Sequence, residues 1–78
     1  MKFRVGGIDH EIDRDRVIRI AGRLEPEPIR KHIVVIEGRE FPPKQVFEAL
    51  TGMDRLDFTV SPARRAFKRL GFDVIRKA

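Results

Sequence analysis

The stretch HIVVIEGREF, residues 32 to 41, is the most strongly β-forming part of this 78-residue chain. Its four apolar residues at 33–36 are consecutive, so both faces of a strand formed here would be apolar, as in strands that are buried on both sides. The Glu37-Gly38 pair that follows suits a tight turn, after which the chain returns along the strand. We therefore predict a central strand and a turn over residues 31–41.

The segment before this strand predicts a hairpin and a helix. Apolar and polar residues alternate on both sides of Gly6-Gly7, and paired glycines readily adopt the positive φ that a two-residue turn requires, so residues 1–12 are expected to form a β-hairpin. Asp13 stands where a helix N-cap is expected, and apolar residues then recur at helical spacing, which predicts a helix over 13–24. The two prolines of the EPEP sequence make the next segment a linker.

Two helices and a strand are predicted downstream. A pair of prolines ends the sheet and begins a helix over residues 43–51, because proline is tolerated in a first helical turn. Ser61 is expected to be the N-cap of a basic helix over 62–70, which Gly71 closes. Residues 72–77 are expected to form a final strand.

The connector between the last two helices is long, and Met53, Leu56 and Phe58 are expected to hold it against the core. The element order is ββ-α-β(β)-α-α-β, which indicates one α+β domain over residues 1–78 with a small mixed sheet and three helices. A winged-helix-like fold is an alternative, since two consecutive helices are followed by a strand. The connector is longer than the tight turn of that motif, so a looser α+β module is equally admissible.

Composition narrows the class of protein. The chain has no cysteine, which excludes a disulfide framework and a thiolate zinc site. No apolar run approaches the roughly 20 residues that cross a bilayer, and the first residues lack the pattern of a signal peptide. We expect a cytoplasmic protein without a membrane partner.

The net charge of +5 is concentrated in the last third of the chain. Residues 1–57 hold eleven Lys/Arg and eleven Asp/Glu, whereas residues 58–78 hold six cations and one acid. An excess gathered in one region favours a polyanionic partner, with nucleic acid first and an acidic protein second.

The basic helix separates its charged and apolar residues completely. At 100° per residue, the cations Arg64, Arg65, Lys68 and Arg69 fall on one face, and no acid lies on the helix to pair with them. A solvated face is the alternative interpretation. With no Trp or Tyr to stack on bases, contact with a duplex is more plausible than with single strands. The nucleic-acid-binding residues expected from the sequence are Ser61, Arg64, Arg65, Lys68, Arg69, Lys44, Arg76 and Lys77.

Two segments carry a resemblance to known proteins. IEGREFPPKQVFEALTG and DFTVSPARRAFKRLGFDV combine a GREFPPKQ motif with a closing LGF motif, and over residues 33–75 they resemble small actinobacterial proteins of uncharacterised type. More distantly they resemble the N-terminal head-like domains of McrA-type HNH restriction endonucleases, which act on modified DNA. The resemblance implies a DNA-associated module in defence or regulation. It carries over to the motif positions Gly38, Arg39, Phe41, Pro42, Lys44, Leu70, Gly71 and Phe72.

The sequence offers no catalytic constellation. His10 and His32 lie far apart within strand patterns, the single serine has a capping role, and no glycine-rich phosphate loop or HNH-like histidine cluster is present. We therefore expect neither an enzyme nor a cofactor or metal site.

Two functions remain open at this point. The leading hypothesis is a small duplex-DNA-binding protein, with dimerisation through the N-terminal hairpin or an exposed sheet edge, because one short helix rarely confers specificity. The alternative is an interaction module that docks an acidic protein.

Overall fold

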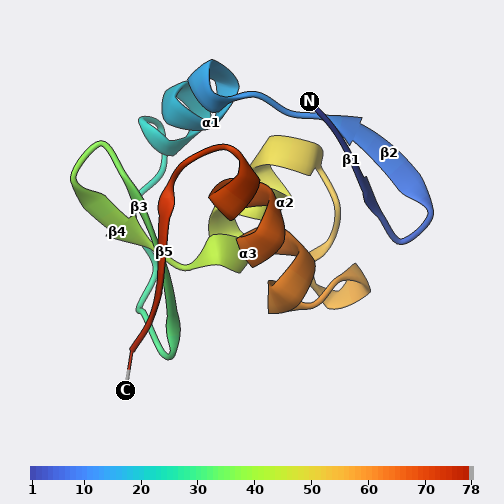
Figure 1. The fold of residues 1–78 in the computed structure, drawn as a ribbon. Helices are drawn as coiled ribbons and strands as arrows, with labels where there is room; N and C mark the ends of the chain where they lie inside the picture. The colour runs from blue at the N-terminus through green and yellow to red at the C-terminus, as the bar shows by residue number, and fades with distance from the viewer. Residues whose placement is uncertain (78) are drawn as a thin grey trace.

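The computed structural model describes residues 1–77 and has the predicted α+β architecture with three helices (Figure 1). The elements follow the predicted order: β1 (Lys2–Val5), β2 (Ile8–Glu11), α1 (Arg14–Ala21), β3 (His32–Ile36), β4 (Arg39–Phe41), α2 (Pro43–Thr51), the 3₁₀ turn η1 (Arg55–Asp57), α3 (Val60–Arg69) and β5 (Asp73–Arg76). No helix within this described part of the chain is long and apolar enough to span a membrane.

The strands form two separate sheets, and every strand pair within residues 1–77 is antiparallel. β3 is central, as predicted, in a three-stranded sheet of order β4-β3-β5, while β1 and β2 pair only with each other. The prediction of one mixed sheet was wrong, because β4 and β5 both run opposite to β3. The turn at Glu37-Gly38, with φ of 50° and 75°, reverses the chain from β3 into β4. β5, which follows α3, pairs antiparallel with the other edge of β3.

The core is built around Phe47 of α2. Its ring, which is fully buried, lies edge-on to the rings of Phe3, Phe58 and Phe67 at centroid distances of 6.5, 5.1 and 6.2 Å. The hairpin, the connector and α3 therefore all pack against one side chain. α2 also packs against α1 and the central strand, so it is the element around which the others assemble (Figure 1).

The helix boundaries match the predictions to different degrees. α2 covers residues 43–51 as predicted and ends at Gly52, whose φ of 75° favours glycine. α1 ends at Ala21 and is shorter than predicted, because after Gly22 the N–H groups of Arg23 and Leu24 bond to carbonyls three residues back, as in a turn. α3 begins two residues earlier than predicted, at Val60, with the extended Thr59 as N-cap.

Ser61 is therefore not the N-cap of α3, and that prediction was wrong. Ser61 and Pro62 both lie inside the first helical turn, and no side chain caps the helix. The N–H groups of a first helical turn have no partner within the helix, so proline, which lacks an N–H, is tolerated at each of these positions. Pro62 therefore does not mark where the helix starts.

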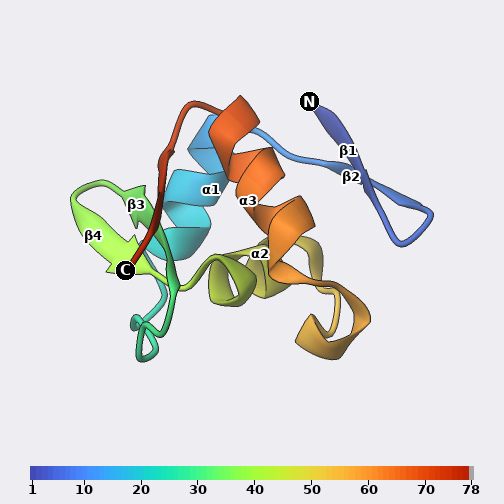
Figure 2. The same cartoon turned by 60° about the horizontal axis from the view of Figure 1, so that its bottom comes forward.

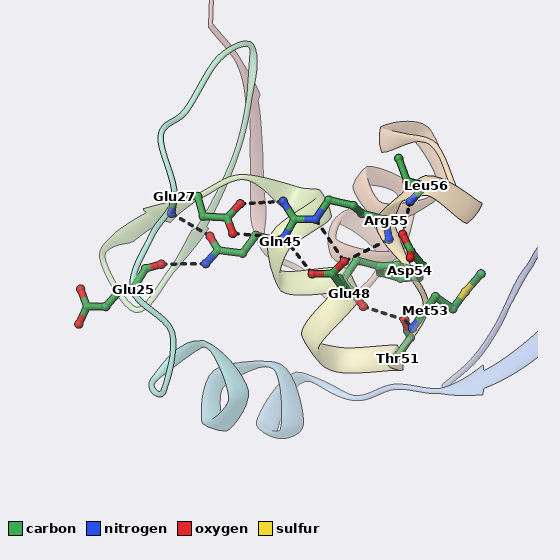
Figure 3. Close-up of polar contacts among 10 residues, drawn as sticks. Glu25, Glu27, Gln45, Glu48, Thr51, Met53, Asp54, Arg55 and Leu56 are labelled. Atoms are coloured by element: carbon green, nitrogen blue, oxygen red, sulfur yellow. Dashed lines mark hydrogen bonds and ion pairs between the residues drawn. The ribbon is translucent and has the colours of Figure 1, made fainter.

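The connector before α3 packs as predicted at Met53 and Phe58 but not at Leu56. Leu56 was expected in the core but is 88% exposed, whereas Phe58 is buried and Met53 packs against the core. The carboxylate of Asp54 accepts a hydrogen bond from the N–H of Leu56 at 2.8 Å and closes a 3₁₀ turn. This turn points Leu56 outward and Arg55 inward (Figure 3).

Arg55 is the centre of a clamp that ties three segments together (Figure 3). Its guanidinium donates to Glu27 at 2.8 Å and to Glu48 at 2.8 Å, and the side chain of Gln45 bonds the linker backbone at Glu25 and Glu27. Hydrogen bonds from Arg55 hold the pKa of both carboxyls below their ordinary value, and the two carboxylates raise the pKa of the guanidinium. The linker and the connector are thereby fixed against α2.

Candidate nucleic-acid interface

The basic helix α3 buries one face and exposes the other, as its periodicity predicts. Ala63, Ala66 and Phe67 are buried, while Arg65 and Lys68 are exposed. The exposed cations therefore stand on the outer face of a helix that the core holds rigidly from behind.

The two edges of this face adjoin different parts of the fold. In Figure 2, α3 runs between β5 and the β1–β2 hairpin. Arg64 is half-buried and acts electrostatically on His32 of the central strand, whereas Arg69 is exposed with its guanidinium carbon 5.9 Å from the ring centroid of Phe3. We call Arg64, Arg65, Lys68 and Arg69 the α3 strip.

The α3 strip has no counter-charge in the described part of the chain. No carboxylate of residues 1–77 lies within 4.0 Å of any of its four cations. A like-charged helix face of this kind is electrostatically unfavourable unless an external anion approaches it.

Three arginines elsewhere in the fold are used differently. Arg14 donates to the carbonyl of Leu70 at 3.1 Å, Arg16 donates to the carbonyls of Glu11 and Leu50, and Arg39 donates to that of Leu24 at 2.9 Å. These guanidinium groups hold chain segments together. The arginine side chains of the α3 strip donate no such hydrogen bond within residues 1–77.

A second group of cations surrounds His32. Burial, followed by the charges of Arg64, Arg76 and Lys31, lowers the pKa of its imidazole. Nδ1 of His32 and Nε of Arg64 are buried without a hydrogen-bond partner among residues 1–77. His32 lies opposite Arg76 across the β3–β5 ladder, which is how two sequence-distant cations come together.

The other predicted binding residues lie outside the strip. Lys44, in the first turn of α2, lines a hollow of about 610 Å³ with His32, and its Nζ is 5.5 Å from the Phe58 ring centroid. Ser61 is exposed in the first turn of α3, and Lys77 follows β5 with its N–H bonded to the carbonyl of Lys31 at 2.6 Å. Four of the eight predicted residues thus form the α3 strip, Lys44, Arg76 and Lys77 belong to the surroundings of His32 and the hollow, and Ser61 belongs to neither group.

Comparison with known families places the whole chain in one of them. A family model described as SCO5918-like matches residues 1–78. The chain belongs to the SCO5918-like family. No curated protein and no solved structure matches it.

In this SCO5918-like chain the GREFPPK and LGF positions have structural tasks. Gly38 adopts a φ of 75° in the β3–β4 turn, and Arg39 lies 5.1 Å above the Phe41 ring while bonding the linker. Gly71, with a φ of 89°, turns the chain after α3, and Phe72 is buried under the guanidinium of Arg14 at 4.3 Å. Pro42 precedes α2 as its N-cap residue.

The histidines and acids of the SCO5918-like chain are dispersed. Across residues 1–77, no group of three or more His, Asp or Glu side chains could hold one metal ion. His10 lies against Phe47, with its Nε2 3.1 Å from the sulfur of Met53.

Sequence reasoning missed two features here. It did not select Lys31 and His32, because their approach to Arg64 depends on how β3 and β5 pair. It also missed the Arg55 clamp, whose members are 7 and 28 residues apart along the chain. The only local signal was the acid–base spacing of Glu48 and Arg55, which no regular element connects.

Proposed function

We propose that the protein binds duplex nucleic acid, DNA in preference to RNA, through the α3 strip, and that it acts as a binding protein without catalytic activity. The observation that carries the proposal is the strip itself: four cations on one helix with no carboxylate of residues 1–77 within 4.0 Å. Phosphate groups are the anions that such arginines and lysines neutralise most readily, by charge and by hydrogen bonds.

The dimensions of α3 suit a duplex. Ten residues at the rise of an α-helix span about 15 Å, and a helix fits the major groove, which is about 12 Å wide. Arg65 and Lys68 project from the middle of the exposed face, with Arg64 and Arg69 at its edges. Arg76 and Lys77, exposed at the end of β5, add charge beside the helix.

A duplex is favoured over a single strand because the described surface offers no aromatic platform. The chain has no Trp or Tyr, and all six Phe residues are at most 7% exposed. Proteins that track single strands stack successive bases on exposed aromatic rings. In this chain the phenylalanine rings belong to the core and cannot stack on bases.

The motif resemblance agrees with this target. Head-like domains of McrA-type HNH endonucleases are associated with modified DNA, and a role in defence or regulation would follow for this chain. The present proposal rests on the α3 strip, with the resemblance as added support.

Paired variants of equal charge test the proposal. Arg65→Ala/Lys68→Ala removes two cations of the strip, and the control Arg19→Ala/Arg23→Ala removes two exposed cations at the end of α1. Affinity for a fluorescent duplex is measured by anisotropy at about 50 mM salt, where phosphate contacts are strong. We expect a loss of about 10- to 100-fold for the strip variant and of about threefold or less for the control.

Equal losses in both variants would mean that only net charge matters, and no loss in the strip variant would refute the proposal. Circular dichroism of each variant verifies that the fold is retained.

A second candidate is docking of an acidic protein segment. Ile75 on the edge strand β5 is 46% exposed directly before Arg76, so an apolar contact and cations adjoin there. An edge strand can also pair with a second copy of the chain, which would give a homodimer. Size-exclusion chromatography with and without nuclease treatment distinguishes these cases, because a protein complex survives loss of nucleic acid.

A further inference from the structure

A hollow of about 610 Å³ opens between the linker before β3 and the first turns of α2 and α3. We call it the proline hollow, after Pro28, Pro42 and Pro43 in its wall. Its volume is in the range of pockets that hold small organic ligands. It is separate from the exposed face of α3, since among its lining residues only Val60 belongs to that helix.

One part of the wall is apolar. The rings of Pro28 and Pro42 and the side chain of Val60 present flat or branched hydrocarbon surface. Pro43 is fully buried, and the Arg55 clamp holds the linker that carries Pro28 in place. The apolar wall is therefore rigid and suits a flat ring system.

The rest of the lining is cationic. Arg30, Lys31 and Lys44 line the hollow without a carboxylate of residues 1–77 within 4.0 Å, whereas Arg55 is neutralised by Glu27 and Glu48. Three cations thus remain available to an anion.

Two further observations point to an anion at this place. His32 lines the hollow, and the charges that act on it come from Arg64, Arg76 and Lys31, with no acid among them. The helices α2 and α3 both begin beside the hollow without a side-chain cap, so the positive ends of both helix dipoles add to the cationic character of this region.

We propose that the proline hollow binds a nucleoside monophosphate, with the base against the proline wall and the phosphate held by Arg30, Lys31 and Lys44. The three cations that would hold the phosphate are not members of the α3 strip, and the site adds a small-ligand function to the duplex binding proposed above. Its ligand needs both a flat ring and a phosphate, because the apolar wall suits the face of a ring and the cations suit a phosphate.

Titration with AMP, adenosine and inorganic phosphate tests both halves of the site by calorimetry. We expect AMP to bind at least about tenfold more tightly than either part alone, because the two contacts are linked in one molecule. Lys31→Ala/Lys44→Ala should weaken AMP binding at least tenfold, and Arg65→Ala/Lys68→Ala should leave it within about twofold. If Arg65→Ala/Lys68→Ala loses duplex binding but keeps AMP binding, the two sites are separate. Loss of AMP binding only in Lys31→Ala/Lys44→Ala then reports on the proline hollow.

NMR of the histidine side chains gives a readout at the site. A phosphate near His32 would oppose the charges of Arg64 on α3, Arg76 on β5 and Lys31 beside it, so AMP should raise the pKa of His32. His10, on the hairpin against Met53, is the internal control and should not respond.

Two results would overturn the proposal. One is that AMP leaves the His32 resonances unchanged, and the other is that the Lys31→Ala/Lys44→Ala variant binds AMP as the unmodified protein does. A 5′-phosphorylated dinucleotide compared with its 5′-hydroxyl form identifies the source of the ligand. Preference for the phosphorylated strand over AMP indicates a strand end, and preference for AMP indicates a free nucleotide.

Discussion

Replacing Phe47 with Leu tests whether the fold is assembled around this one side chain. The ring is fully buried and has four ring neighbours: Phe3, His10, Phe58 and Phe67. Edge-to-face contacts contribute about 0.5–1.5 kcal/mol each beyond burial. Leucine keeps most of the buried apolar area but loses all four contacts, so the free energy of unfolding should fall by at least about 2 kcal/mol.

This loss is large for a chain of 78 residues, whose total stability is expected to be about 4–12 kcal/mol. Because the chain has no Trp or Tyr, unfolding in urea is followed by far-UV circular dichroism. At a slope of about 1 kcal/mol per molar urea, the midpoint should fall by about 2 M.

The matched control is Leu56→Ala, which removes a large apolar side chain that is 88% exposed. It should change the free energy of unfolding by about 0.5 kcal/mol or less. Equal midpoints for the two variants would refute the reasoning, since Phe47 would then contribute no more than a surface leucine.

Two further predictions concern the Arg55 clamp and the turn after α3. In the folded chain Arg55 holds the pKa of the Glu27 and Glu48 carboxyls below 4.5. The ion pairs therefore stabilise the fold fully at pH values above the pKa that these carboxyls have in the unfolded chain. This stabilisation is lost as the pH falls through the lower pKa values that they have in the folded chain. Arg55→Met should therefore lower the urea midpoint at about pH 7, and the deficit should shrink towards about pH 3; a deficit independent of pH would contradict the clamp. Gly71→Ala should cost about 1–2 kcal/mol in urea unfolding, because Gly71 has a φ of 89° and the added carbon would lie 3.3 Å from Nη1 of Arg14; an unchanged midpoint would show that the turn tolerates a side chain.

Local sequence signals predicted the elements that depend on local physics. The apolar run at 33–36 indicated the central strand, and the prolines at 42–43 with Gly52 bounded α2 correctly. The 100° periodicity likewise divided α3 into its buried and exposed faces. In each case the deciding residues lie within one element.

Features that depend on distant residues could not be read in the same way. Leu56 is apolar, yet the 3₁₀ turn closed by Asp54 directs it to solvent. The division into two sheets depends on where the N-terminal hairpin packs, which no local pattern encodes. Ser61 resembles a cap because of Pro62, but the helix is entered earlier, from Thr59.

The candidate site shows the same limit. The α3 strip was predictable because its residues are close in sequence and carry no acid. The proline hollow was not, since it requires the linker, α2 and the start of α3 to converge, and the linker is held to α2 by the clamp at Arg55. Lys44 was selected from the sequence for its place in a first helical turn, and in the structure it lines the same hollow as Lys31 and His32.

The measurement that tests the central proposal most directly is the dependence of duplex affinity on salt. Four to six phosphate contacts from the α3 strip and its neighbours predict a slope of log K on log salt of about −4 to −5 for duplex DNA, with weaker binding to single strands. The Arg65→Ala/Lys68→Ala variant should reduce the steepness by about 2. A slope near zero, or equal affinity for single strands and duplexes, would contradict duplex recognition by α3.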